Sequence, residues 1–163
     1  EAMSISDNIA VMDKGIIQQI GNPREIYQRP KNLFVATFVG RTNVINATIE
    51  KGSITFHNGT VISDDNWKDI PAQIIKASIR PEEFVIHNSS DDIKGFTGTV
   101  ISSIYLGLNT HYTIRISNNE NVEVVRESII DDNIHPGDGV ILTVKKEKIN
   151  FFNESGQENL ITG

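Results

Sequence analysis

The chain has 163 residues, 38% of them hydrophobic and 22% charged, and a formal net charge of −6 at pH 7; these proportions are typical of a folded chain with an ordinary core, in one domain or two small ones. The acidic excess argues against nucleic-acid binding, which requires clustered lysine and arginine. The absence of cysteine excludes disulfides and thiolate metal sites, and every apolar run is shorter than the roughly 18 residues of a membrane-spanning helix.

A β-hairpin is expected near the start of the chain. Short apolar runs at 9–12 and 16–20 flank Asp13-Lys14-Gly15, and a three-residue connection that ends in glycine predicts a hairpin with a bulge. The apolar strand at 9–12 presents an exposed edge unless something covers it. We therefore expect the hairpin to pack on the β barrel that follows, or to exchange onto a second copy.

Two short helices are expected next. Asn22 followed by Pro23 predicts a helix start, because asparagine caps a helix and proline fits its first position. Pro30 ends this helix. Residues 33–39 are apolar on nearly every side and predict a second helix, which Gly40 stops. Such a helix must be buried, against the hairpin or against a partner.

From residue 41 onward the pattern predicts strands, so the expected fold is mainly β. Regular turns, including Asn58-Gly59 as a two-residue hairpin turn, indicate an OB-like small barrel or two β lobes, 41–87 and 95–152. Residues 153–163 are expected to be a flexible tail. The expected strands are 44–50, 54–57, 60–63, 73–80, 84–87, 96–106, 112–116, 122–126, 140–145 and 149–152.

Several short motifs follow one another along the chain in a specific order. A hairpin-and-helix succession from Ser6 to Pro30 is followed by Phe-Val-Gly-x-x-Asn, Ile-Arg-Pro-Glu, Tyr-Leu-Gly and Gly-Asp-x-Val. Together these motifs resemble the C-terminal regulatory domain, called TOBE, of the ATP-binding subunits of ABC importers for spermidine/putrescine, ferric iron, sulfate or maltose. Asn8 departs from the pattern, since the family usually has arginine there. The four later motifs lie at 38–43, 79–82, 105–107 and 137–140.

The resemblance implies a division of the chain and a role. Residues 1–40 would be the C-terminal tail of the ATP-binding domain, and 41–152 the OB-like TOBE domain. The implied role is regulation and dimerisation of an import ATPase, with a second copy as partner in a homodimer and with membrane subunits reached through the ATP-binding domain. The implied location is cytoplasmic, peripheral at the inner face of the cell membrane. The alternative role is sensing of a small ligand, an oxyanion or a solute.

No catalytic site is expected in this chain. Nucleotide binding needs a Gly-x-x-x-x-Gly-Lys-Ser/Thr loop, whose main-chain N–H groups surround phosphate, and the sequence has none. We therefore expect no cofactor here, although the resemblance implies ATP and Mg for a full-length subunit. The four histidines lack the spacing of a metal site; they are His57, His87, His111 and His135.

Two groups of residues are candidates for a regulatory or interface site. Arg80 is expected to pair with Glu82 in a structural ion pair, or else to bind an anion or a partner's carboxylate. Tyr105, Leu106 and Gly107 are expected to bend a long strand, where glycine relieves crowding, or else to line a pocket between lobes. The polar groups near this bend that are available to a sensed ligand are Ser102, Ser103, Asn109 and Thr110.

Overall fold

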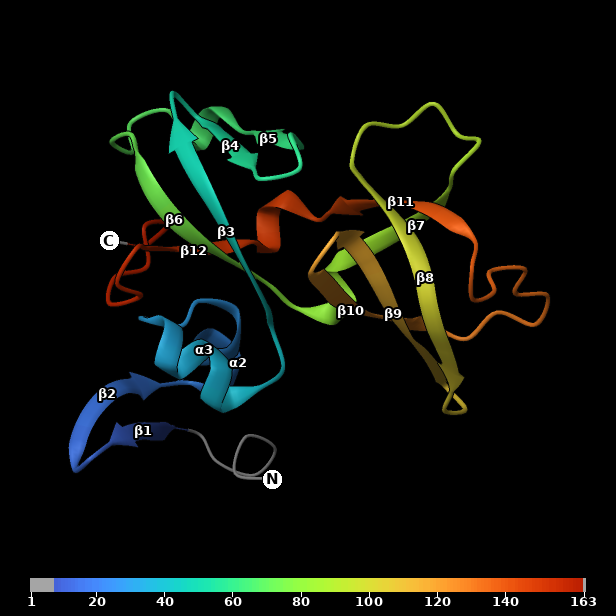
Figure 1. Ribbon diagram of the computed structural model, residues 1–163. Helices are drawn as coiled ribbons and strands as arrows, with labels where there is room; N and C mark the ends of the chain where they lie inside the picture. The colour runs from blue at the N-terminus through green and yellow to red at the C-terminus, as the bar shows by residue number, and fades with distance from the viewer. Residues whose placement is uncertain (1–7, 163) are drawn as a thin grey trace.

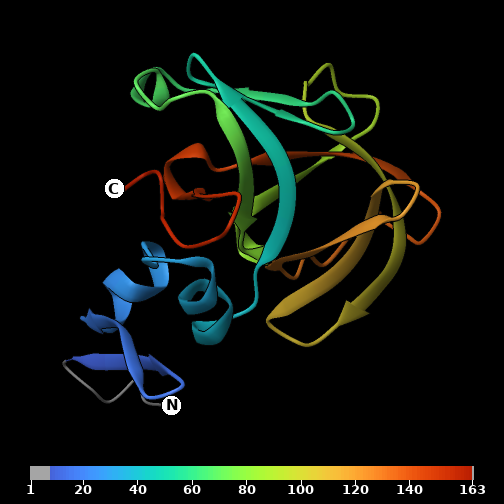
Figure 2. The same ribbon diagram turned by 60° about the vertical axis from the view of Figure 1, so that its left-hand side comes forward.

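The fold is mainly β, with an N-terminal hairpin and two helices, in the computed structural model, which describes residues 8–162 (Figure 1). This confirms the predicted fold class. Ten strands form two curled antiparallel sheets of five strands each. Figures 1 and 2 both show the helices and the hairpin below the first of these sheets. The parts of the predicted segments at residues 1–7 and 163 lie outside the described residues.

The hairpin has a tighter connection than predicted. Asp13 pairs with Ile16, so only Lys14 and Gly15 form the turn, with φ angles of 52° and 79°. Two positive φ angles give a turn whose twist matches that of the flanking strands. The predicted bulge is present, but it lies within the ladder, where the register shifts after Val11. The two strands are β1 (Ile9–Asp13) and β2 (Ile16–Gly21).

Asparagine caps both helices. The Asn22 side chain accepts from Arg24 N at 2.9 Å, and the Asn32 side chain accepts from Val35 N at 3.0 Å. The helices cover the hairpin and form a small core with it, made by Val11, Ile26 and Val35. The hairpin therefore packs on the helices of its own chain, and the predicted packing on the barrel is wrong; exchange onto a second copy stays a prediction. The helices are α2 (Pro23–Gln28) and α3 (Leu33–Val39).

The hairpin does not bury all of α3, as the first predicted alternative required; burial of this helix against a partner stays a prediction. Val35 and Ala36 are buried, but Phe38 is 66% exposed. The Phe38 ring stacks on Phe34 with the two centroids 5.8 Å apart. The apolar residues of this helix thus exceed what the hairpin can cover.

The first sheet has the strand order β12-β6-β3-β4-β5. Side chains alternate between buried and exposed along β3, as expected for a sheet with one face on a core. Asn58-Gly59 is not a two-residue turn. Gly59 N donates to Phe56 O at 2.9 Å, and only the glycine of the pair has a positive φ, 89°. The strands are β3 (Asn43–Glu50), β4 (Ser53–Phe56), β5 (Val61–Ser63), β6 (Gln73–Ile79) and β12 (Asn150–Asn153).

The second sheet has the order β10-β9-β8-β11-β7. One hydrophobic core joins it to the first sheet, with Phe56, Phe84 and Phe96 in edge-to-face contact at the centre. The two sheets therefore share a core, as the walls of one curled barrel do. The strands are β7 (Phe84–Asn88), β8 (Phe96–Tyr105), β9 (Asn109–Ser117), β10 (Glu120–Glu127) and β11 (Gly139–Val144).

Membership of the two sheets differs from the predicted lobes 41–87 and 95–152. Strand β7 joins the second sheet, while β12 returns to the first and pairs with β6. The segment after β12 is not a free tail over residues 154–162. Asn159 is buried and forms an isolated β-bridge with Phe152. Its main-chain N–H donates to Lys31 O, and its side chain donates to Pro30 O, so this segment is bonded to the helical part of the chain.

Candidate functional site: a buried junction and an exposed hairpin tip

Arg80 is the centre of the junction between the helices and the β domain. It follows β6 directly and precedes the short turn Pro81–Glu83, and only 3% of its surface is exposed. Its guanidinium donates to three main-chain carbonyls: Nη1 to Ala36 O at 3.1 Å and Arg41 O at 3.0 Å, and Nη2 to Tyr27 O at 3.1 Å. One side chain thus satisfies carbonyls near the ends of both helices, which helices themselves leave free.

Tyr27 completes the packing around Arg80. The Arg80 Cζ lies 4.0 Å from the centroid of the Tyr27 ring, and Tyr27 Oη donates to Glu82 Oε2 at 2.5 Å. The predicted ion pair between Arg80 and Glu82 is therefore replaced by a chain in which tyrosine stands between them. Gly40 allows this approach, because a Cβ there would lie 2.9 Å from Tyr27 Cε2.

Burial shifts the titration of this cluster. It lowers the pKa of the Arg80 guanidinium, and it raises the pKa of the Glu83 carboxyl and of the Tyr27 phenol, which the hydrogen bond to Glu82 raises further. Glu83 Oε1 accepts from Arg80 N at 2.8 Å, which partly offsets the burial. The junction thus keeps charged groups away from water and supplies hydrogen bonds in place of hydration.

A second group of hydrogen bonds joins the helical segment to β12 and the segment that follows it. Arg29 donates to Ile149 O at 2.9 Å and to Asn150 Oδ1 at 3.0 Å. Asn159 Nδ2 donates to Pro30 O at 2.8 Å and to Asn150 Oδ1 at 3.0 Å. Arg29 and Pro30 belong to the succession from Ser6 to Pro30 that carries the resemblance, but no motif pointed to Asn150 or Asn159. The only sequence signal of these two asparagines is a short amide side chain, which is too common to be specific.

Asn43 connects the two sheets at the junction. Its Nδ2 donates to Glu123 O at 2.9 Å and to Ile79 O at 3.1 Å, and its Oδ1 accepts from Glu123 N at 2.8 Å. The asparagine side chain therefore pairs with the main chain of β10 as another strand would. This explains the asparagine of the Phe-Val-Gly-x-x-Asn motif in structural terms.

The other candidate group lies at the tip of the β8–β9 hairpin, which projects from the second sheet (Figure 1). Leu106 N donates to Asn109 O at 2.9 Å and closes the turn. Gly107 has a φ of 86° and open space where a Cβ would stand, so its role is turn geometry and not the relief of crowding. Tyr105 is 73% exposed and Leu108 85% exposed. The tip therefore lines no interior pocket.

The neighbouring loop enlarges this apolar surface. Ser128 N donates to Leu108 O at 2.8 Å, which brings Ile129 and Ile130 next to the hairpin. Both isoleucines are exposed. We call this surface the apolar tip; its residues are Ile104, Tyr105, Leu106, Leu108, Ile129 and Ile130.

A partly buried polar cluster holds the loop beneath the apolar tip. Tyr112 Oη donates to Asp132, and Arg126 Nη2 donates to Asp132 Oδ1 at 2.9 Å. Burial acts to raise the pKa of Asp132, but hydrogen bonds from Tyr112 and Ile134 N and the charge of Arg126 outweigh it and hold that pKa below its ordinary value. Burial, together with the bond to Asp132, raises the pKa of Tyr112.

The structure does not bring the predicted candidates into one site. Glu82 and Asn109 line one surface groove, whereas Arg80 lies buried at the junction and Tyr105 to Gly107 lie at the tip. The polar groups proposed for a sensed ligand are not gathered either. Thr110 is buried and bonded to Ser128 at 3.0 Å.

Neither a membrane-spanning helix nor a metal centre is found in the part of the chain that the structure describes. No helix within residues 8–162 is long and apolar enough to cross a membrane. Over the same range, no three side chains of the histidine, aspartate and glutamate types gather in a way that could hold a metal ion.

Residues 77–152 match the model of the TOBE domain family. The chain is 46% identical over 166 residues to the Fe(3+) ions import ATP-binding protein FbpC of Fusobacterium nucleatum, an alignment that covers 100% of this chain and 44% of that protein. It is 38% identical over 136 residues to the spermidine/putrescine import ATP-binding protein PotA of a Nostoc species, covering 77% of this chain and 36% of the relative. The chain therefore spans less than half the length of these relatives.

Among solved structures, the cytoplasmic molybdate-binding protein ModG has a similar fold. The TM-score is 0.52 at 14% sequence identity, over 67% of this chain and 94% of that chain. This likeness supports the OB-like arrangement of the strands and nothing beyond it. The family match and the identities confirm the resemblance drawn from the motifs: residues 77–152 match the TOBE domain family, and the chain matches the C-terminal TOBE region of the ATP-binding proteins of ABC importers.

Proposed function

We propose that this chain is the accessory regulatory and dimerisation part of the ATP-binding subunit of an importer for ferric iron or for spermidine/putrescine, and that it performs no catalysis itself. In this proposal the ATP-binding domain uses ATP and Mg and contacts the membrane subunits, so that the subunit is cytoplasmic and peripheral to the membrane. The proposal rests on the contrast between two regions: the helices are joined to the β domain by buried hydrogen bonds, and the apolar tip is exposed to solvent.

The rigid end supports a role in transmitting motion. Arg80, Arg29 and Asn159 each bond residues of the helical segment to residues of the β domain or its end. Rigid elements joined by hydrogen-bond networks can couple a conformational change in one domain to the position of another. A displacement of the helices would therefore move the whole β domain with them.

The apolar tip supports contact with a second copy. Its six residues are uncharged, whereas the chain as a whole carries −6, so two copies can meet there without bringing like charges together. Large apolar side chains exposed side by side are typical of interaction surfaces. Six residues are a small part of the about 20 to 30 residues per partner of a standard interface. We therefore expect weak self-association.

Sedimentation velocity over a range of concentrations tests the dimerisation proposal. The chain should show a reversible rise in mass at high concentration, and the double variant Leu106→Ser/Leu108→Ser should remain monomeric. Ile74→Ser is the matched control, because Ile74 is an exposed isoleucine on β6, in the other sheet. A chain that stays monomeric at every concentration would contradict the proposal, as would equal losses in the variant and the control.

The absence of catalysis has its own test. The purified chain should not hydrolyse ATP in the presence of Mg, because its sequence lacks the phosphate-binding loop. Steady turnover that survives repeated purification and scales with the concentration of this chain would overturn that part of the proposal.

A further inference from the structure

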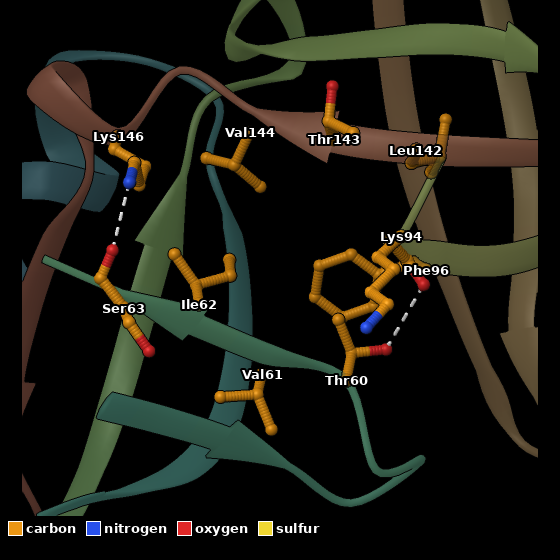
Figure 3. A pocket seen from close by; sticks show the side chains of 11 residues that line it. Thr60, Val61, Ile62, Ser63, Lys94, Phe96, Leu142, Thr143, Val144 and Lys146 are labelled. Atoms are coloured by element: carbon orange, nitrogen blue, oxygen red, sulfur yellow. Dashed lines mark hydrogen bonds between the residues drawn. The ribbon is translucent and has the colours of Figure 1, made fainter. Parts of the chain in front are cut away.

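A second surface feature, unrelated to the junction and the apolar tip, has the chemistry of a binding site. A pocket of 240 Å³ lies between the edge strand β5, the start of β8 and the end of β11 (Figure 3). This volume is below the range of drug-sized pockets, so it suits a small molecule. Its position, between the two sheets, is independent of the proposed dimer contact.

The floor of the pocket is apolar and its rim is cationic. Ile62, Phe96, Leu142 and Val144 form the floor, and the latter two come from the same strand. Lys94 and Lys146 are the charged lining residues, and none of the described lining residues is acidic. A basic lining is unexpected in a chain with 21 acidic and 15 basic residues, so this pocket is a local exception to the charge of the protein.

The two lysines lie at opposite ends of the pocket (Figure 3). Lys146 Nζ donates to Ser63 O at 2.9 Å, while Lys94 adjoins Gly95, whose carbonyl accepts from Thr60 at 3.5 Å. Thr60 and Ser63 are three residues apart on extended chain, or about 10 Å. Figure 3 shows Ile62 and Phe96 between these ends.

Both ammonium groups are available to a ligand. Neither lysine takes part in an ion pair within residues 8–162. Lys146 has one hydrogen bond to a carbonyl, and an ammonium has three N–H donors. The Ser63 hydroxyl is hydrogen-bonded to Ser53 Oγ at 2.7 Å and the Thr143 hydroxyl to His87 Nε2 at 2.8 Å, so the site depends on the two lysines for its donors.

We propose that this pocket binds a short α,ω-dicarboxylate, that is, a hydrocarbon chain with a carboxylate at each end. Each carboxylate accepts from one lysine, and the hydrocarbon covers the floor between them. A compact inorganic anion matches this site poorly, because it reaches one lysine and places its charge against apolar side chains. A ligand with one carboxylate makes half of the charged contacts.

Amide chemical shifts of the chain, followed during titration with adipate, test the proposal. Saturable shifts are expected at Ser63, Gly95, Phe96 and Val144. Hexanoate, which has the same length and one carboxylate, should bind about fivefold more weakly, the value of one solvent-exposed ion pair of about 1 kcal/mol. This comparison uses the unaltered chain and does not depend on how any variant folds.

Two variants locate the contacts. Lys94→Met should reduce adipate affinity by about fivefold, to the level of hexanoate, whereas Lys68→Met should leave it unchanged, because Lys68 is an exposed lysine outside the pocket lining. The proposal is overturned if adipate gives no saturable shifts, if adipate and hexanoate bind equally, or if the shifts map to another surface. Since none of these measurements involves self-association, their failure would leave the dimerisation proposal standing.

Discussion

Charged side chains are ordinarily exposed and large apolar side chains ordinarily buried, and the buried junction and the apolar tip each depart from one half of this rule. The junction places an arginine in the interior at 3% exposure, and the tip places a leucine in solvent at 85% exposure. Arg80 has hydrogen-bond partners for its charge within this chain, whereas Leu108 has no cover for its apolar surface in the described structure. The junction therefore satisfies its polar groups within this chain, whereas the tip leaves large apolar side chains exposed.

The largest expected effect is that of Arg80→Met. Methionine keeps much of the volume but removes three hydrogen bonds and leaves the carbonyls of Tyr27, Ala36 and Arg41 without their donor. We expect the free energy of unfolding, measured with urea, to fall by about 3 kcal/mol. Arg80→Lys is the informative companion, because a single ammonium cannot reproduce the planar fork and should recover only part of the loss.

A loss below about 1 kcal/mol in Arg80→Met would contradict the view that the junction is held by its polar contacts. It would mean that the helices and the β domain are joined mainly by apolar contact. The hydrogen bonds of Arg29 and Asn159 would then be the polar contacts that hold the helices against the β domain.

Asp132→Asn tests whether polar contacts stabilise the loop beneath the apolar tip, as they are expected to stabilise the junction. The change removes the ion pair with Arg126 and disturbs the bond from Tyr112, so we expect a loss of about 1–2 kcal/mol at pH 7. The pKa of Asp132 lies below its ordinary value of 3.8 in the folded chain. Its stabilising contribution is therefore complete above 3.8 and is lost as the pH falls through the folded value.

Urea unfolding of both chains between pH 7 and pH 2 checks this prediction. The difference between the unaltered chain and the variant should narrow below about pH 4. A difference that is the same at all pH values would show that the carboxylate charge of Asp132 is not what holds the loop. In that case the hydrogen-bond geometry alone would account for the loss.

Local rules predicted the elements well where a residue acts on its own neighbours. Asn22 and Pro23 mark the start of α2 because capping involves residues two or three positions away. The same rules erred at Asn58-Gly59, since a dipeptide preference does not fix the length of a loop. They also predicted a free tail at 153–163, because a polar composition does not reveal that Asn159 bonds to Pro30, 129 positions earlier.

The sequence singled out residues of the candidate sites, but it did not predict their bonding partners or their exposure. Arg80 stood out by its place before Pro81, but its partners are main-chain carbonyls 39 to 53 positions away, and a carbonyl leaves no mark in the sequence. Tyr105 to Gly107 were found by their motif, yet exposure depends on how far the hairpin projects. Ile129 and Ile130 joined the tip only because the fold brings Ser128 against Leu108.

Glu83→Gln should act in the opposite direction to Asp132→Asn. Burial raises the pKa of Glu83 above its ordinary value of 4.5, so its ionisation opposes folding. Glutamine can still accept the bond from Arg80 N and carries no charge. We expect a gain in stability of less than about 1 kcal/mol at pH 7, and the gain should vanish below 4.5, where the carboxyl is protonated in both states. Urea unfolding at pH 7 and at pH 4 checks the sign; a loss at pH 7 would mean that the carboxylate is favourable at the junction.

The smallest effect on folding is expected for Leu108→Ser. Because this side chain is almost fully in solvent, its replacement should change the free energy of unfolding by less than about 0.5 kcal/mol, measured by urea unfolding at a concentration too low for self-association. At high concentration the unaltered chain should gain stability as its concentration rises and the variant should gain less, because stability from association depends on the contact between copies. A large loss in the dilute monomer would show that Leu108 packs within its own chain, and the apolar tip would then be part of the fold and not a surface for a second copy.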